Sequence, residues 1–451
     1  MITKFKYSKL TFFLISISSL FAIVYNIFYY NPILGYDAEA HFNYVNYLSR
    51  YLPNDFKLPS SEETREFFNP PLGYLVPSIA QVFCRNIIES ENYLNDCQPI
   101  YGKTTQVFQA IMYVFTIMLN LFTLKIFHKS KSIFNVSYLI LVSIFAVNYR
   151  TISMIRGEPY ILFFLSLFLF VILKAEINNY ELNYRLILFT GVIISCIALS
   201  RQWGFFLFLP LIILILYKNS KIKYFVYWFY CGTIGFLLSG WFYLGLYKKY
   251  GSVTAFNMKQ SSFSFSNQVL SFYIPNQSQI KYLFQKPIRP NLDNQFLSIL
   301  YSDLWGDYWG YFTFTSRFLE IGRNQDNIGD YLARVNIISI FTSLILIIFC
   351  CLAYKKYKSE FLVRYVNFAI LISFIGYFLF SIAYPNSSGD TIKSTYIIQA
   401  FHLVAFLASI YFYDLEKINK RVYNSILTLL VIIYFHNFQT FLSHFPINFL
   451  N

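Results

Sequence analysis

The sequence predicts an all-α polytopic membrane protein, and three observations lead to this fold class. The chain of 451 residues is 56% hydrophobic and only 13% charged, whereas soluble domains carry roughly a quarter charged residues. Apolar runs long enough to cross a bilayer recur along its whole length. Polar residues collect instead in two long segments, about 31–104 and 247–336. Because backbone polar groups inside a bilayer must bond within the chain, the apolar runs are predicted to be helices.

About eleven transmembrane helices are predicted, at roughly 20 apolar residues for each crossing. The first run is too long for a removable signal peptide and has no clear small-residue cleavage site, so it is expected to stay as the first span. Several of the later runs are short. The predicted spans are residues 10–30, 105–126, 133–148, 159–174, 186–200, 203–217, 224–246, 337–354, 362–383, 395–413 and 422–440.

Lysine and arginine clusters follow several even-numbered spans, such as Lys125, Lys129 and Lys131 after the second. If the spans alternate, these clusters lie on one side, which the positive-inside rule assigns to the cytoplasm. The two polar segments, with most of the 22 carboxylates, then lie on the extracytoplasmic side. Membrane topology thus accounts for the net charge of +14, and no nucleic-acid partner is predicted.

The chain is accordingly divided into three predicted parts. Residues 1–246 form an N-terminal membrane module that includes the external segment 31–104. Residues 247–336 form an external cap of short helices and turns, and residues 337–451 supply the C-terminal membrane helices. The protein is expected in a bacterial inner membrane or the ER membrane, in contact with membrane lipids and with its active site on the extracytoplasmic or lumenal side.

The six cysteines indicate neither a metal centre nor a redox motif. Cys84 and Cys97 lie in one polar segment and can pair if that segment faces an oxidising compartment. The other four lie in apolar spans, where a small buried hydrophobe is the expected role. No Cys/His cluster has zinc spacing. No cofactor and no metal site are therefore predicted, although a divalent metal is compatible with the acids described below.

The polar segment that follows the first span keeps Asp37, Glu39 and His41 close to the membrane surface. Helical spacing puts Asp37, His41 and Tyr44 on one face of a short amphipathic helix lying in the interface. Asp37 can then act as a general base on an acceptor hydroxyl, or it can simply cap the helix. Glu39 is the second catalytic candidate, and His41 is expected to support substrate binding.

These residues also carry a resemblance. An Asp/Glu pair after the first span, an interfacial helix and the N-P-P-L-G-Y stretch at 69–74 resemble the GT-C glycosyltransferases. The match is closest to the branch of protein O-mannosyltransferases and aminoarabinose transferases, which take sugars from polyprenyl phosphates. The resemblance implies a lipid-linked sugar donor, a lipid, glycan or protein acceptor, and a catalytic role for Asp37. The family often has adjacent acids, whereas Ala38 separates Asp37 from Glu39 here.

Three basic residues are predicted to bind the donor phosphate: Arg156, Arg201 and Lys393. Arg156 and Glu158 open the fourth span in a stretch that resembles an R-x-E-P feature of related enzymes. Arg156 suits a phosphate and Glu158, a further substrate-binding candidate, suits a helix N-terminus; the alternative is a pair that only caps the helix. Arg201 lies between two short spans and is costly to place in hydrocarbon. Lys393 resembles a basic family residue, or it snorkels at the interface.

A second group of candidates lies in the cap, where Asp303 and Asp307 alternate with Trp305 and Trp309 at helical spacing. Aromatic faces beside carboxylates can hold a sugar, because its apolar face stacks on the rings and its hydroxyls donate to the acids. Asp303, Trp305 and Asp307 are therefore predicted to bind substrate. The alternative is an aromatic belt at the membrane interface.

The sequence thus predicts a membrane glycosyltransferase that moves a sugar from a polyprenyl-phosphate donor to an acceptor, with inversion at the anomeric carbon. The alternative is a multi-pass transporter or lipid flippase, which would place ionisable residues at mid-span depth and break its helices. A non-catalytic scaffold would show no dependence on Asp37. Most acids here lie in loops and at span ends, with His402 an exception inside a span, and this distribution favours the enzyme.

Overall fold

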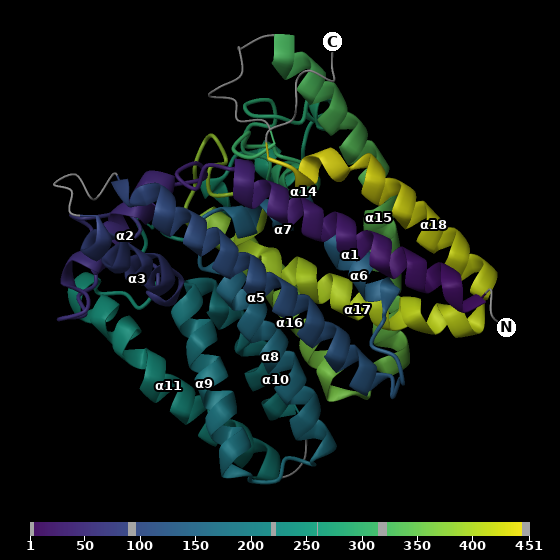
Figure 1. Ribbon diagram of the computed structural model, residues 1–451, viewed down its shortest axis with the longest axis horizontal. Helices are drawn as coiled ribbons and strands as arrows, with labels where there is room; N and C mark the ends of the chain where they lie inside the picture. The colour runs from purple at the N-terminus through teal and green to yellow at the C-terminus, as the bar shows by residue number, and fades with distance from the viewer. Residues whose placement is uncertain (1–3, 89–95, 218–221, 259, 314–322, 444–451) are drawn as a thin grey trace.

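The computed structural model describes residues 4–88, 96–217, 222–258, 260–313 and 323–443, and every regular element in them is a helix (Figure 1). Within these ranges, seven helices are long and apolar enough to cross a membrane, or eight if one bent pair counts as a single span. The prediction of an all-α polytopic membrane protein is confirmed. The seven are α1 (Lys4–Tyr29), α5 (Gln98–Phe127), α8 (Glu158–Ile177), α11 (Ile222–Tyr250), α15 (Arg323–Tyr357), α16 (Phe361–Ala383) and α17 (Ile398–Ile418) with the short helix η3 (Ser394–Ile397) before it.

The predicted number of eleven spans is not confirmed, although all eleven ranges are largely helical. The range 133–148 is split into α6 (Val136–Ser143) and α7 (Ala146–Ser153), whose axes differ by 68°. The remaining ranges are too short for a full crossing of about 30 Å at 1.5 Å per residue. They are α9 (Tyr184–Ser200), η1 (Gln202–Leu207) with α10 (Leu209–Tyr217), and α18 (Lys420–His436).

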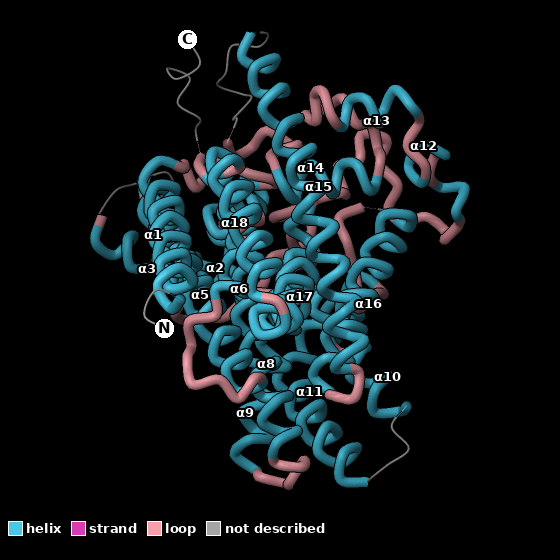
Figure 2. The backbone as a smooth tube through the Cα atoms, turned by 90° about the vertical axis from the view of Figure 1, so that its right-hand side faces the viewer, coloured by secondary structure: helices cyan, strands magenta, loops and turns pink. Residues whose placement is uncertain are grey.

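Helix α17 forms the centre of the bundle, as Figure 2 shows. It packs against α6, α8, α15, α16 and α18, and 83% of its most apolar stretch is buried. Small residues such as Ala400, Ala405 and Ser409 are fully buried there and let its neighbours approach closely. By contrast, α1 exposes Leu10, Phe13 and other large apolar side chains. Exposed side chains of this kind suit contact with lipid hydrocarbon.

The polar segment after α1 folds into α2 (Ala38–Tyr51) and α3 (Leu72–Ile87), which pack on each other and on α5. The predicted amphipathic helix is confirmed in α2. Its solvent-facing side carries Glu39, Asn43 and Arg50, whereas the face that was predicted to be polar is buried at His41 and Tyr44. Both are held by the segment that leads into α3: the Tyr74 hydroxyl meets His41 Nδ1 at 2.7 Å, and the Tyr44 hydroxyl donates to the Asn69 carbonyl.

The second polar segment forms η2 (Phe265–Asn267), α12 (Leu270–Tyr273), α13 (Gln277–Leu283) and α14 (Phe296–Trp305). Helix α14 packs on α7, α15 and η3. We call the end of the bundle that carries α2, α3 and α14 the loop end (Figure 1). The start of α1 and the ends of α5 and α17 lie at the opposite end. The division into two membrane parts and an external cap at 247–336 stays a prediction, and residues 259 and 314–322 of the cap lie outside the described part.

A disulfide joins Cys84 of α3 to Cys97, directly before α5, across 13 positions of sequence. Replacing both cysteines by serine is expected to lower the free energy of unfolding by about 3 kcal/mol, because a closed loop of this length restricts the unfolded chain. Thermal unfolding in detergent, with the Cys351→Ser variant as control, measures this effect. Unchanged melting of the double variant would contradict the expectation.

Candidate functional site

A cavity of about 740 Å³ opens at the loop end, between the start of α2 and two segments near residues 289–311 and 386–393. Parts of the chain that are far apart in sequence therefore share one wall. Polar and aromatic groups make up much of this wall. The charged and tryptophan side chains on it are Asp37, Glu39, Arg65, Arg289, Trp309, Asp390 and Lys393.

Asp37 directly precedes α2, and its backbone has the left-handed conformation, with φ 55°. Aspartate is one of the few residues that adopt this conformation readily. Its side chain makes no capping hydrogen bond, so the interpretation of Asp37 as a helix cap does not hold. The carboxylate instead pairs with Arg65, at 2.8 Å from Oδ1, and with Lys393, at 3.4 Å from Oδ2.

Lys393 is 3% exposed and precedes η3. Its ammonium lies 3.3 Å from Asp390 and within 6 Å of the rings of Tyr36, Trp309 and Tyr396. Burial alone would lower the pKa of Lys393, but Tyr396, Asp37 and Asp390 raise it above its ordinary value. The ammonium therefore stays charged at physiological pH. Its burial contradicts snorkelling into water as the reason for its position.

The Asp37 carboxylate is ionised as well. Burial alone would raise the pKa of Asp37, but Lys393, Arg156 and Arg65 together lower it below its ordinary value. Opposite charges at close range favour the charged form of both partners. The cavity wall thus presents one fixed negative and one fixed positive charge side by side.

Arg156 lies behind the cavity wall, in contact with Tyr36, which lines the cavity. Its Nη2 donates to the Tyr36 carbonyl at 2.7 Å, and its guanidinium lies 5.1 Å from the Tyr36 ring. The side chain is 1% exposed, and Nε has no hydrogen-bond partner. Within the described part of the chain, Arg156 forms no ion pair with a carboxylate. A buried cation without its own counter-ion keeps its charge available to an anion on the other side of Tyr36.

Arg201 does not reach the cavity. It is buried, and it pairs with Glu158 at 3.0 Å and with Glu66 at 3.9 Å. Glu158 therefore pairs with Arg201, and not with Arg156 as the capping alternative supposed. His41 joins the same cluster at 4.0 Å from Glu66, and burial lowers its pKa well below the ordinary value, so it is neutral. Arg201, Glu158 and His41 are buried structural neighbours of the site, outside its wall.

Two glycines explain how the two stretches that resemble family motifs come together. A β-carbon on Gly73, in the N-P-P-L-G-Y stretch, would lie 2.8 Å from the Cα of Gly157, in the R-x-E-P-like stretch. A β-carbon on Gly157 would collide with the Ser200 carbonyl. Only glycine permits this contact between backbones, which holds α3, α8 and the end of α9 together beneath the cavity.

The predicted sugar platform is not on the cavity wall. Asp303, Trp305 and Asp307 are all at most 1% exposed. The reason is Arg150 of α7, which pairs with Asp303 at 2.9 Å and with Asp307 at 3.6 Å. Trp305 packs its ring against Phe145, at 5.3 Å between ring centres. Of the aromatic residues considered in this stretch, Trp309 does line the cavity.

Asp303 and Asp307 instead position the backbone around the cavity. Asp303 accepts hydrogen bonds from the Tyr36 hydroxyl at 3.0 Å and from the backbone N–H of Ser394 at 2.7 Å. Asp307 accepts one from the N–H of Phe312 at 2.9 Å. The residue that immediately precedes Asp37 and the residue that immediately follows Lys393 are thus tied to the same carboxylate. Arg150 holds both acids in place.

The structure therefore brings Asp37, Glu39 and Lys393 to one cavity and leaves Arg156 directly behind it. Glu39 is exposed on the first turn of α2. Sequence reasoning missed Arg65, Glu66 and Arg150. Arg150 had a signal, since it follows an apolar run in which an unpaired cation is costly. Across the described residues, no group of three or more His, Cys, Asp and Glu side chains is arranged to hold a metal ion.

Comparison with known proteins finds similarity to solved structures. No protein-family model matches the chain, and no curated protein matches it. Among solved structures, the crystal structure of the oligosaccharyltransferase of Archaeoglobus fulgidus, in complex with Zn and sulfate, is similar with a TM-score of 0.48 and 14% sequence identity. The alignment covers 95% of this chain and 53% of that one, so this chain spans about half the length of its structural neighbour.

Proposed function

We propose that the protein is an integral membrane glycosyltransferase of the GT-C type. It would move a sugar from a polyprenyl-phosphate donor to an acceptor hydroxyl on the extracytoplasmic face. The observation that carries this proposal is the pair formed by the ionised Asp37 carboxylate and the buried Lys393 ammonium, 3.4 Å apart on the wall of one cavity. Transfer from a lipid phosphate requires a proton acceptor and a cation within reach of one another.

The reaction would proceed by direct displacement. The acceptor hydroxyl gives its proton to Asp37 while its oxygen forms a bond to the anomeric carbon of the sugar. The bond between that carbon and the phosphate oxygen breaks, and its electron pair leaves with the lipid phosphate. Lys393 stabilises the negative charge that develops on this phosphate, and Arg156 adds a positive potential from behind Tyr36. Attack opposite to the leaving group inverts the anomeric centre.

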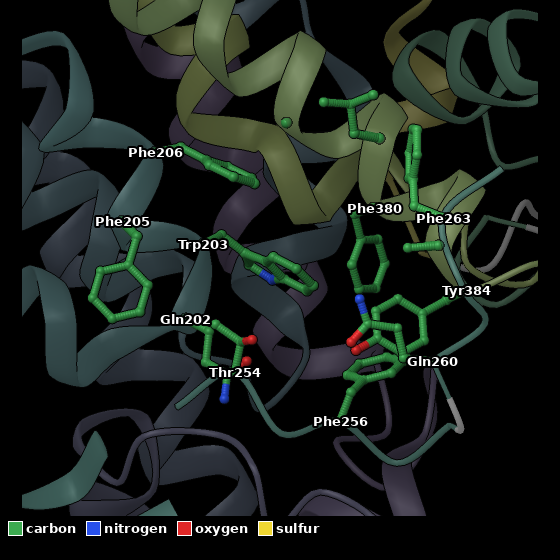
Figure 3. Close-up of a pocket in the computed structure, with 13 residues that line it drawn as sticks. Gln202, Trp203, Phe205, Phe206, Thr254, Phe256, Gln260, Phe263, Phe380 and Tyr384 are labelled. Atoms are coloured by element: carbon green, nitrogen blue, oxygen red, sulfur yellow. The ribbon is translucent and has the colours of Figure 1, made fainter. Parts of the chain in front are cut away.

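An apolar groove supports a lipid as the carrier. It has a volume of about 550 Å³ and lies between η1, α16 and residues 254–263, with the rings of Trp203, Phe256 and Phe380 around it (Figure 3). The Trp203 ring lies 5.6 Å from the Tyr396 ring, which in turn lies 5.6 Å from the Lys393 ammonium. A phosphate at Lys393 would therefore have an apolar surface beside it for an isoprenoid chain.

Two observations support the extracytoplasmic side. The site lies at the loop end, whereas the basic clusters that the positive-inside rule assigns to the cytoplasm lie next to the opposite helix ends. The disulfide between Cys84 and Cys97 is also at the loop end, and disulfides persist in oxidising compartments. A bacterial inner membrane or the ER membrane would provide this arrangement.

The decisive experiment is a transfer assay in proteoliposomes with radiolabelled sugars. Protein is supplied with sugars linked to polyprenyl phosphate or, in parallel, to nucleoside diphosphates, together with extracts of lipid, glycan and protein acceptors. We expect label to move only from the lipid-linked donors and only when they are accessible from the loop-end side. Transfer from the nucleotide sugars alone would contradict the donor class.

Lipid transport is the second candidate, favoured by the 68° break between α6 and α7 and by the buried Arg150 after it. In a transporter such charges face a water-filled path. Arg150 is instead held by Asp303, Asp307 and two backbone carbonyls, which suits a fixed structural role. A flipping assay with fluorescent polyprenyl phosphate in the same liposomes separates the two functions, and we expect no movement of lipid.

A further inference from the structure

Both oxygens of the proposed base are occupied in this structure, and the two cations that occupy them differ sharply in exposure. The side chain of Arg65 is 57% exposed, whereas that of Lys393 is 4% exposed. Lys393 is enclosed by aromatic rings and by Asp390. Of the two cations on Asp37, Arg65 is therefore the one that can leave.

The backbone on either side of Arg65 is fixed. The Thr64 hydroxyl donates to the Ala40 carbonyl at 2.6 Å, and the N–H of Glu66 donates to the Thr64 hydroxyl at 3.2 Å. Thr64 and Glu66 are each 4% exposed. Movement of Arg65 would thus be confined to its long side chain, whose five donor groups can reach several positions above the cavity.

The cavity also presents an electrostatic conflict for the proposed reaction. Asp37, Glu39 and Asp390 place three carboxylates on its wall against three cations, Arg65, Arg289 and Lys393, so a lipid phosphate would bring an excess of negative charge. At the same time a base needs a free oxygen, and Oδ1 of Asp37 lies 2.8 Å from the Arg65 guanidinium. One displacement of Arg65 would resolve both difficulties.

We propose that Arg65 is a movable counter-ion of the site, which pairs with Asp37 while the cavity is empty and transfers to the donor phosphate when the donor binds. This inference rests on the proposed function and deepens it. A guanidinium can form bidentate hydrogen bonds to two phosphate oxygens, which makes the phosphate a stronger partner than a single carboxylate oxygen. Departure of Arg65 frees Oδ1 for the acceptor hydroxyl.

The charged groups around Asp37 determine how its pKa changes when Arg65 leaves. Arg65, Arg156 and Lys393 face it as cations, while Glu66 and the Tyr396 hydroxyl lie within electrostatic range. Loss of one cation raises the pKa of Asp37, because its ionised form loses stabilisation. Transfer of Arg65 to the phosphate thus makes Asp37 a stronger base when the substrate is present.

The test measures binding of polyprenyl phosphate, the product anion, to the full-length protein in nanodiscs of neutral lipid. The Arg65→Ala variant is expected to bind about tenfold more weakly, the loss of one charge-assisted hydrogen bond, and Arg65→Lys is expected to recover part of that affinity. Lys57→Ala is the matched control. Lys57 is also an exposed cation of this segment, paired with Asp55 at 3.2 Å, but it does not line the cavity.

A second readout separates this role from a structural one. In the transfer assay, the acid limb of kcat/KM should move to higher pH in Arg65→Ala and stay in place in Lys57→Ala. Equal binding by wild type and Arg65→Ala would overturn the inference and leave the proposed function intact. Failure of wild type itself to bind polyprenyl phosphate would overturn the proposed donor, and with it the role of Arg65.

Discussion

Replacing Asp37 by asparagine is expected to lower kcat for sugar transfer by about 10²- to 10⁴-fold, the usual contribution of a positioned general base. The amide keeps the size of the side chain but cannot accept a proton. It also leaves Lys393 and Arg65 without one of their partners, so affinity for the donor phosphate should be kept or increased. The expected signature is therefore a large loss in kcat with little rise in the donor KM.

The control for this variant is Asp55→Asn. Asp55 belongs to the same segment, its side chain is 53% exposed and it pairs only with Lys57 among the ion pairs of the described residues. This variant should transfer sugar at the wild-type rate. Full activity of a folded Asp37→Asn protein would exclude Asp37 as the base. Glu39, the other acid at the start of α2 on the cavity wall, would then be the candidate base.

Replacing Arg150 by methionine is expected to lower the free energy of unfolding by about 3–5 kcal/mol, the cost of breaking a buried ion pair on one side. The change leaves the carboxyl groups of Asp303 and Asp307 without the guanidinium in a core where both are at most 1% exposed. It also removes the donors to the Asp303 and Gly306 carbonyls. Thermal unfolding of the purified protein in detergent measures the loss.

Two further variants show whether the unpaired carboxylates cause the loss of stability in Arg150→Met. Adding Asp303→Asn and Asp307→Asn to Arg150→Met removes the uncompensated carboxylates and should restore part of the lost stability. Arg185→Ala, at an exposed arginine in the first turn of α9, should melt as wild type does. If Arg150→Met melts like wild type, the buried cluster contributes nothing to stability and the positioning of the cavity backbone needs another explanation.

The fold class could be predicted because it depends on composition and on the length of apolar runs, both local properties. The short helix at 38–51 was equally accessible, since amphipathic spacing is a local pattern. The number of spans could not be predicted in the same way. A run such as 133–148 does not reveal that the chain bends by 68° between two short helices. The lengths of the helices that form, such as the 17 residues of α9, are also not given by the apolar runs alone.

Some residues of the site could likewise be predicted from local sequence, and others could not. Asp37 stood out because a carboxylate directly after a first span is unusual, and the structure places it on a cavity wall. Asp303 and Asp307 are buried, and the sequence does not show this because acids and tryptophans at helical spacing fit a sugar-binding surface as well as they fit a core. Their partner Arg150 is 153 positions away in sequence, and no local pattern connects them. Arg65 lies in a loop of mixed charge, where nothing marks one cation over another.

The long separation of these partners has a consequence for biogenesis. The chain is made from its N-terminus, so Arg150 is synthesised well before the two aspartates that neutralise it. Until then its guanidinium must remain in water or at the membrane surface, because burying it alone is costly. The break that follows α6 keeps α7 a separate short helix, which can dock late. A nascent chain released before residue 303 would thus carry a cation without the carboxylates that pair with it in the complete protein.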